Sequence, residues 1–193
     1  MKNNIRALTT TAIFAAISTI LMFFSFSVPF APSYLKIDFS DLPALLASFS
    51  LGPVYGVVVS LIKNLINVFF TTTGGVGEIS NFLLSAFFVF PAGVIYKRNK
   101  TKKTAVYGML TGLVTTTLLS YFTNTYLVYP AYSKIMPVDV IINMSSKIIS
   151  SVNSVSDVIV IFNMPFTFVK GILNAIVTFL LYKRLSPIIV PKK

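Results

Sequence analysis

The sequence contains no cysteine, no histidine and no tryptophan, and only 11% of its 193 residues are charged. Without cysteine there is no disulfide framework and no thiol nucleophile. Without histidine the commonest zinc ligand and general base are missing as well. Most redox, metal and triad chemistries therefore lack their usual carriers, and we expect neither an enzyme nor a metal site nor a bound cofactor.

Hydrophobic residues make up 55% of the chain, which is more than a water-soluble domain of this length normally carries. The formal net charge is +11, but the basic residues flank apolar segments, which argues against nucleic-acid binding. The apolar run after Met1–Arg6 is as long as a membrane span and has no small-residue cleavage site, so we expect a retained first helix. No repeat or linker divides the chain, and residues 1–193 are expected to form one membrane-embedded domain.

Six apolar runs, separated by polar or Pro- and Gly-containing connections, predict an all-α integral membrane protein with six transmembrane helices. The second run is too short to cross about 30 Å of hydrocarbon as one straight helix. Gly52-Pro53 separates it from the third run, so we expect a half-depth or tilted element. The six runs cover residues 7–28, 42–51, 53–72, 79–96, 104–129 and 158–182.

The charged residues separate by side when the N-terminus is placed in the cytoplasm. Eleven basic residues then lie at cytoplasmic ends and three in outer loops, a positive-inside pattern that predicts cytoplasmic N- and C-termini. A five-span arrangement would move the segment around Lys100 to the outer side. The cytoplasmic set is Lys2, Arg6, Lys97, Arg98, Lys100, Lys102, Lys103, Lys183, Arg184, Lys192 and Lys193; the outer loops hold Lys36, Lys134 and Lys147; the five acids, on the outer side or its boundary, are Asp38, Asp41, Glu78, Asp139 and Asp157.

Lys170 lies inside the last apolar run, where an ammonium group is costly unless it faces the bundle interior and finds acceptors. Thr167, Lys170 and Asn174 recur at i, i+3 and i+7, just below Pro165, and share one helix face. This polar stripe favours a hydrogen-bond donor in a ligand cavity. The alternative is a lysine that extends to the interface or pairs with an acid for structural reasons.

Lys63 and Asn67 share one face of the third run, and here a structural and a functional role are equally well supported. Lys63 can simply neutralise one of the outer acids. The following glycine-rich turn, residues 71–78, lacks the Gly-Lys-Ser/Thr ending of a phosphate loop. Glu78 and Asn81 begin the next helix, where an acid complements the helix dipole, and contact with a ligand is also open.

The outer connection Tyr34–Pro43 mixes aromatic and charged residues. It is either an interfacial loop with a helix N-cap or a lid over an outward-facing cavity. Asn124, near the outer end of the fifth run, can offer two donors and an acceptor to one planar ligand edge. Small residues at Ala12, Ala15 and Ala16, and at Gly108 and Gly112, permit close helix approach, either within the protein or to another membrane protein.

Several strings are more specific than a generic six-span pattern. They are LKIDFSDLPALL (35–46), LGPVYGVVVSLIKNLINVFF (51–70), GVGEISNF (75–82), FPAGVIYKR (90–98) and MPFTFVKG (164–171). Together with residues 124–132, they make the chain resemble the substrate-binding S components of energy-coupling-factor (ECF) vitamin transporters, most closely the riboflavin-specific members. The resemblance runs from the first helix to the last.

The resemblance implies a subunit of the bacterial cell membrane that captures riboflavin at the outer face, as a transported ligand and not a cofactor. It implies a complex with a transmembrane coupling protein and two cytoplasmic ATPases. In riboflavin members an asparagine at the end of the fifth helix and a lysine in the sixth contact the isoalloxazine ring, and the matching residues are Asn124 and Lys170. Thr167 stands where the family often has asparagine, and Ala12 and Ala16 match the face presented to the coupling protein.

The first outer loop covers the ligand in such proteins, which adds residues of that loop and of the following helices to the expected site. Three other functions remain open: an S component for another vitamin or for FMN, an ion-driven secondary carrier, and a membrane enzyme. A carrier would normally use buried acids, and no acid falls in the middle of an apolar run. The added site residues are Leu35, Lys36, Asp38, Phe39, Leu42, Glu78 and Asn81.

Overall fold

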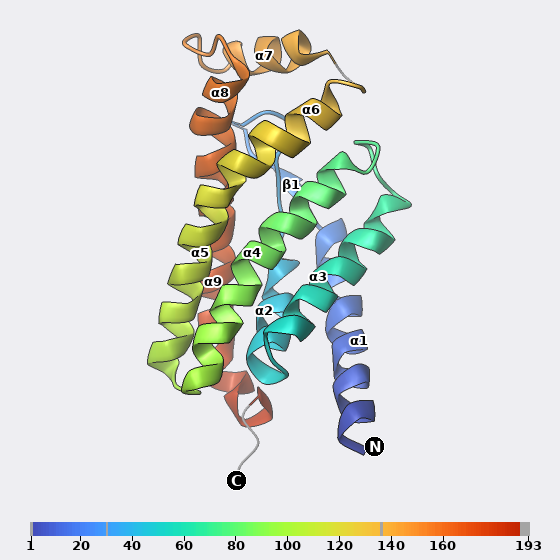
Figure 1. The fold of residues 1–193 in the computed structure, drawn as a ribbon, viewed down its shortest axis with the longest axis vertical. Helices are drawn as coiled ribbons and strands as arrows, with labels where there is room; N and C mark the ends of the chain where they lie inside the picture. The colour runs from blue at the N-terminus through green and yellow to red at the C-terminus, as the bar shows by residue number, and fades with distance from the viewer. Residues whose placement is uncertain (1, 30, 136, 190–193) are drawn as a thin grey trace.

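The computed structural model describes residues 2–29, 31–135 and 137–189, with side chains for residues 5–29, 31–135 and 137–181. It is a bundle of helices with one two-stranded ladder (Figure 1). In chain order the elements are α1 (Lys2–Phe23), β1 (Phe26–Ser27), β2 (Lys36–Ile37), α2 (Asp41–Ser50), α3 (Pro53–Val68), α4 (Val76–Arg98), α5 (Lys102–Thr123), the π-helical turn η1 (Asn124–Val128), α6 (Tyr129–Tyr132), α7 (Val138–Ser146), α8 (Val155–Val158), the π-helical turn η2 (Ile159–Asn163) and α9 (Met164–Ile189).

Among the described residues, four continuous helical segments are long and apolar enough to cross a membrane: Ile5–Phe23, Val76–Arg98, Lys102–Tyr132 and Val155–Leu181. The third joins α5, η1 and α6, and the fourth joins α8, η2 and most of α9. α3 is apolar but shorter. Each of the six predicted runs contains a helix, and the chain is a multi-pass membrane protein by the length and composition of these segments.

α2 lies at the centre of the bundle. Every residue from Asp41 to Phe49 is buried, and α1, α3, α4 and α9 all pack against this helix. At ten residues it is about 15 Å long, so it is short, as the sequence predicts. Ser40 does not cap it with a side-chain hydrogen bond, contrary to one interpretation of the outer connection.

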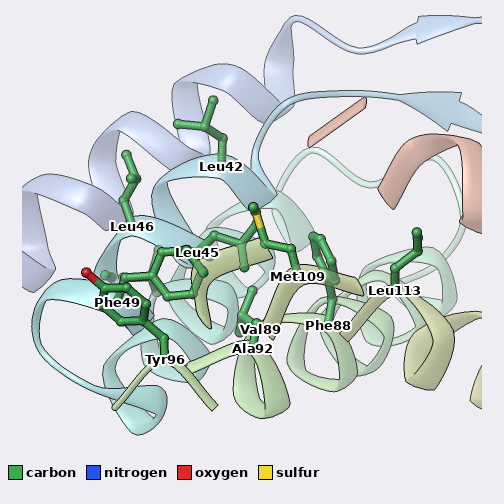
Figure 2. Close-up of a cluster of buried hydrophobic side chains, with 14 of the residues drawn as sticks. Leu42, Leu45, Leu46, Phe49, Phe88, Val89, Ala92, Tyr96, Met109 and Leu113 are labelled. Carbon is green, nitrogen blue, oxygen red and sulfur yellow. The ribbon is translucent and has the colours of Figure 1, made fainter. Parts of the chain in front are cut away.

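The main hydrophobic core joins α2 to α4 and α5 (Figure 2). The rings of Phe49 and Tyr96 lie 4.5 Å apart between centroids. Gly108 brings α5 so close to α4 that a Cβ atom there would lie 2.6 Å from the Ala92 carbonyl oxygen, and Gly112 makes a similar approach to Phe88. These two glycines therefore serve packing within the protein.

Two features of the connections differ from the prediction of six helices joined by loops. Phe26 pairs with Ile37 and Ser27 with Lys36 in a small antiparallel ladder between α1 and α2. α7 lies in the connection between the last two membrane-capable segments, where the sequence shows no apolar run long enough to predict a helix. α7 packs through Ile141 on a second cluster of buried residues, which includes Tyr129 and Phe162.

The two ends of the bundle carry different elements (Figure 1). The start of α1, the end of α9 and the α4–α5 turn lie at one end, and α6, α7 and α8 lie at the other. The lysines of the α4–α5 turn therefore share an end with both termini of the described chain. Lys192 and Lys193 lie outside the described residues, as do the side chains of Lys2, Lys183 and Arg184.

Candidate ligand-binding site

Lys170 meets two of the other predicted site residues. Its Nζ donates to Oδ2 of Asp38 at 2.8 Å and to Oδ1 of Asn81 at 3.1 Å. Asn174, one turn further along α9, donates to the backbone carbonyl of Asp38 at 3.0 Å. The lysine thus connects α9 to α4 and to the loop before α2, and the predicted polar stripe on α9 faces the bundle interior. The ion pair with Asp38 is the pairing that the sequence offered as the structural alternative for Lys170.

Lys63 forms a second ion pair beside the first. Its fully buried Nζ lies 2.6 Å from Oδ1 of Asp41 and 2.6 Å from Oγ of Ser40. Ser85 also donates to the Asp41 carboxylate, at 2.6 Å. Lys63 therefore has the structural role of neutralising an outer acid, one of the two roles that the sequence left open.

Ser40 links the two ion pairs. Its backbone N–H and its hydroxyl both donate to Oδ1 of Asp38, and the same hydroxyl accepts from Lys63. Burial alone would raise the pKa of Asp38, but the ammonium groups of Lys170 and Lys63 outweigh this and hold the pKa below its ordinary value of 3.8. Asp38 and Asp41 are buried, only 4% and 6% exposed, but each is neutralised by a lysine.

A separate polar cluster surrounds Asn124. Its Oδ1 accepts from Nδ2 of Asn163 at 3.0 Å, and Oδ1 of Asn163 accepts from the hydroxyl of Tyr129 at 3.1 Å. The hydroxyl of Tyr34, from the first outer connection, lies 3.2 Å from that of Tyr129. Within the described residues, no hydrogen bond joins this cluster to Lys170, although both predicted ring contacts face the bundle interior.

Both asparagines lie at π-helical turns. Asn124 begins η1 and Asn163 ends η2. A π turn inserts one residue into a helix and changes which side chains face the interior, and such turns occur often at functional sites. Asn163 is not among the site residues predicted from the sequence, because the predicted polar stripe on the last helix begins at Thr167. Its spacing of four residues before Thr167 is the signal that could have found it.

The other predicted site residues take different positions. Glu78 is buried and accepts from Asn67, Thr71 and Thr73, so it organises the α3–α4 turn. Thr167 is half-buried on α9, close in sequence to Lys170. In the first outer connection, Leu35 packs on the cluster under α7, Lys36 is exposed, Phe39 is half-buried and Leu42 belongs to the main core.

Within the described residues, no group of three or more acidic residues is placed to hold a metal ion. What the site offers is a set of amide, ammonium and hydroxyl groups inside an apolar bundle. Such groups fix the orientation of a planar polar ligand by hydrogen bonds and do not themselves suggest bond-making chemistry.

A family model described as "ECF transporter, substrate-specific component" matches residues 6–182. The chain belongs to this family. Its members are S components of transporters and not enzymes, in agreement with the resemblance described above.

Individual S components are similar over nearly the whole chain. The riboflavin transporter RibU of Staphylococcus aureus is 37% identical over 187 residues, which cover 96% of this chain and 93% of the relative. The riboflavin transporter FmnP of Bacillus subtilis is 29% identical over 95% of this chain and 93% of its own length. A solved structure, described as the S component of a bacterial ECF transporter, has a TM-score of 0.75 at 34% identity and covers 97% of this chain and 98% of its own.

Proposed function

We propose that this S component captures riboflavin at the outer face of a bacterial cell membrane. The relatives named as riboflavin transporters support the choice of vitamin. The observation that carries the proposal is the position of Lys170, whose side chain is 13% exposed and whose ammonium group is held between Asp38 and Asn81 inside an apolar bundle. Two of its three hydrogens are used there, and the third is available to a carbonyl oxygen of the flavin ring.

In this proposal the isoalloxazine ring is held by Asn124, Lys170 and Thr167. The connection from Leu35 to Pro43 covers it. Riboflavin is a neutral, planar molecule with hydrogen-bonding edges, which suits an apolar slot with a few placed polar groups. Because Asp38 and Asp41 are each paired with a lysine, the site carries no excess charge that would favour an ionic substrate over a neutral one.

The proposed topology has six membrane segments, with α2 short and enclosed, and both termini in the cytoplasm. The basic α4–α5 turn, the start of α1 and the end of α9 lie at the same end of the bundle, which agrees with positive-inside placement. The substrate then enters at the end formed by α6, α7 and α8. Transport requires a transmembrane coupling protein and two ATPases, and α1 presents the exposed Ala12 and Ala16 to the coupling protein.

The test is a titration of the purified, flavin-stripped full chain with riboflavin, followed by quenching of flavin fluorescence. We expect a dissociation constant below about 1 µM and a loss of at least tenfold in affinity for Lys170→Met. Lys103→Met, which removes an exposed lysine from the first turn of α5, is the matched control and should bind like the wild type. Thiamine, biotin and FMN are titrated in parallel.

If riboflavin fluorescence is not quenched but another vitamin binds tightly, the chain would be an S component of the same family for that other vitamin. A second measurement tests the mechanism: vesicles that hold only this chain should bind riboflavin but not accumulate it with ATP inside. Accumulation without a coupling module would contradict the proposal and favour an autonomous carrier.

A further inference from the structure

A series of hydrogen bonds runs from the first outer connection to η1 through Tyr34, Tyr129, Asn163 and Asn124. The successive distances are 3.2 Å between the two hydroxyls, 3.1 Å from the Tyr129 hydroxyl to Oδ1 of Asn163, and 3.0 Å from Nδ2 of Asn163 to Oδ1 of Asn124. The series ends at a backbone group, because Nδ2 of Asn124 donates to the carbonyl oxygen of Ser120 at 2.7 Å.

That backbone carbonyl sets the direction of the whole series. A carbonyl oxygen only accepts, so the amide group of Asn124 that faces Ser120 must be NH2, and its oxygen must face Asn163. Asn163 then has to present its own NH2 to Asn124 and its oxygen to Tyr129. The single hydrogen of Tyr129 is used on Asn163, which leaves Tyr34 as the donor to the Tyr129 oxygen.

Burial makes this direction hard to reverse. Asn124, Tyr129 and Asn163 are only 3%, 4% and 6% exposed. Flipping either amide would therefore place two donors or two acceptors against each other, and little water could reach them to compensate. The two asparagines come from facing π-helical turns, η1 and η2. Tyr34 lies half-buried, and its burial raises the pKa of its hydroxyl, with hydrogen bonds to Tyr129 and Ser145 acting in the opposite direction. The hydroxyl therefore stays protonated and able to donate at neutral pH.

We propose that Asn163 is a positioning residue that fixes the Asn124 amide, with Tyr129 holding Asn163, and that this determines which ligand edge the site accepts. The inference rests on the proposed function. With one hydrogen given to Ser120 and one lone pair given to Asn163, Asn124 keeps one N–H and one lone pair in fixed positions. An edge with a donor beside an acceptor complements that pair, as the imide edge of a flavin does with its N3–H between two carbonyls.

The experiment compares riboflavin with 3-methylriboflavin, in which a methyl group replaces the N3 hydrogen. Both are titrated by fluorescence quenching on the full chain. Wild-type protein should prefer riboflavin by about tenfold or more, the effect of losing one well-placed hydrogen bond in a buried site. In Asn163→Leu the preference should fall to about threefold or less, because the Asn124 oxygen loses its partner and the amide is free to turn.

Two controls match the substitutions. Thr125→Val removes a hydroxyl from η1 that is buried and has no hydrogen-bond partner in the described structure. Tyr126→Phe removes the hydroxyl of a 74% exposed tyrosine from the same turn. Both should keep the wild-type preference. If Asn163→Leu does not fold, Tyr129→Phe removes only one oxygen and should lower the preference about threefold, with the thermal midpoint measured for every variant.

The outcomes separate the inference from the function it rests on. Absence of riboflavin binding by the wild type would refute the proposed function itself. Riboflavin binding without discrimination against the N3-methyl compound would overturn the inference and leave the function standing. Equal weakening of both ligands by Asn163→Leu or Tyr129→Phe, at an unchanged ratio, would show that Asn163 only stabilises the fold. A reduced ratio with normal controls supports the assignment.

Discussion

The ammonium group of Lys170 lies 2.8 Å from Oδ2 of Asp38, although the two residues are 132 positions apart in the chain. Asp38 belongs to the loop before α2 and Lys170 to α9, so this ion pair joins the first outer connection to the last helix. The carboxylate keeps a second cationic neighbour, because Ser40 links it to Lys63. A ligand group that drew Lys170 away would therefore leave Asp38 with a remaining hydrogen-bond partner and a nearby positive charge.

Lys170→Met should lower both stability and riboflavin binding, for two separable reasons. Removing one partner of a buried pair leaves the other charge uncompensated, which typically costs about 3–5 kcal/mol. The thermal midpoint of the purified protein without riboflavin measures this loss. Lys170→Met combined with Asp38→Asn should recover most of the midpoint but not the affinity for riboflavin. Recovery of both would mean that Lys170 serves only the fold.

Stability should fall in acid as Asp38 is protonated. The folded-state pKa of Asp38 is held below its ordinary value of 3.8 by Lys170 and Lys63. A depressed pKa contributes stability above the unfolded-state value, and this is lost as the pH falls through the folded-state value. The thermal midpoint should therefore drop below about pH 4, and less steeply in Asp38→Asn. Asp139→Asn, at an exposed acid of α7, should keep the wild-type slope.

Gly108 and Gly171 should respond differently to alanine. At Gly108 the new Cβ would lie 2.6 Å from the backbone oxygen of Ala92, which cannot move without shifting α4. At Gly171 it would lie 2.5 Å from Cδ1 of Leu113, the end of a side chain that can rotate. We expect Gly108→Ala to cost about 1–3 kcal/mol of stability and Gly171→Ala to cost clearly less, compared by thermal unfolding. Equal losses would contradict the close α4–α5 contact.

Much of the helical layout could be predicted from the sequence, because lipid requires long apolar helices and their composition is unmistakable. The pairing of Lys63 with an outer acid and the packing role of Gly108 were each one of two alternatives that the sequence left open, and the structure decides between them. The enclosure of α2 could not be predicted in this way. An apolar helix has the same composition whether it faces lipid or other helices, so only its length showed that it was unusual.

The contacts within the site were harder to predict. That Lys170 meets Asp38 depends on how α9 packs against a loop far away in the sequence. Asn163 faces Asn124 because each lies at a π-helical turn. Each turn inserts one residue, so the regular period of 3.6 residues no longer predicts which side chains share a helix face. Sequence patterns therefore identified most of the polar residues but not their partners.

The exposed face of α1 offers a test of assembly that is independent of ligand binding. Ala12 and Ala16 are exposed, while Ala15, on the adjacent side of the helix, is only 2% exposed and belongs to the main core. A small-residue pair four positions apart permits close approach of another helix. Ala12→Leu with Ala16→Leu should therefore reduce co-purification with the coupling protein and ATPases at least tenfold, while riboflavin quenching stays unchanged. Thr111→Leu, which places a leucine on the exposed side of α5, should leave assembly intact. Normal assembly of the double variant would place the docking surface on another helix, whereas loss of riboflavin binding would mean that α1 supports the site instead of the partner.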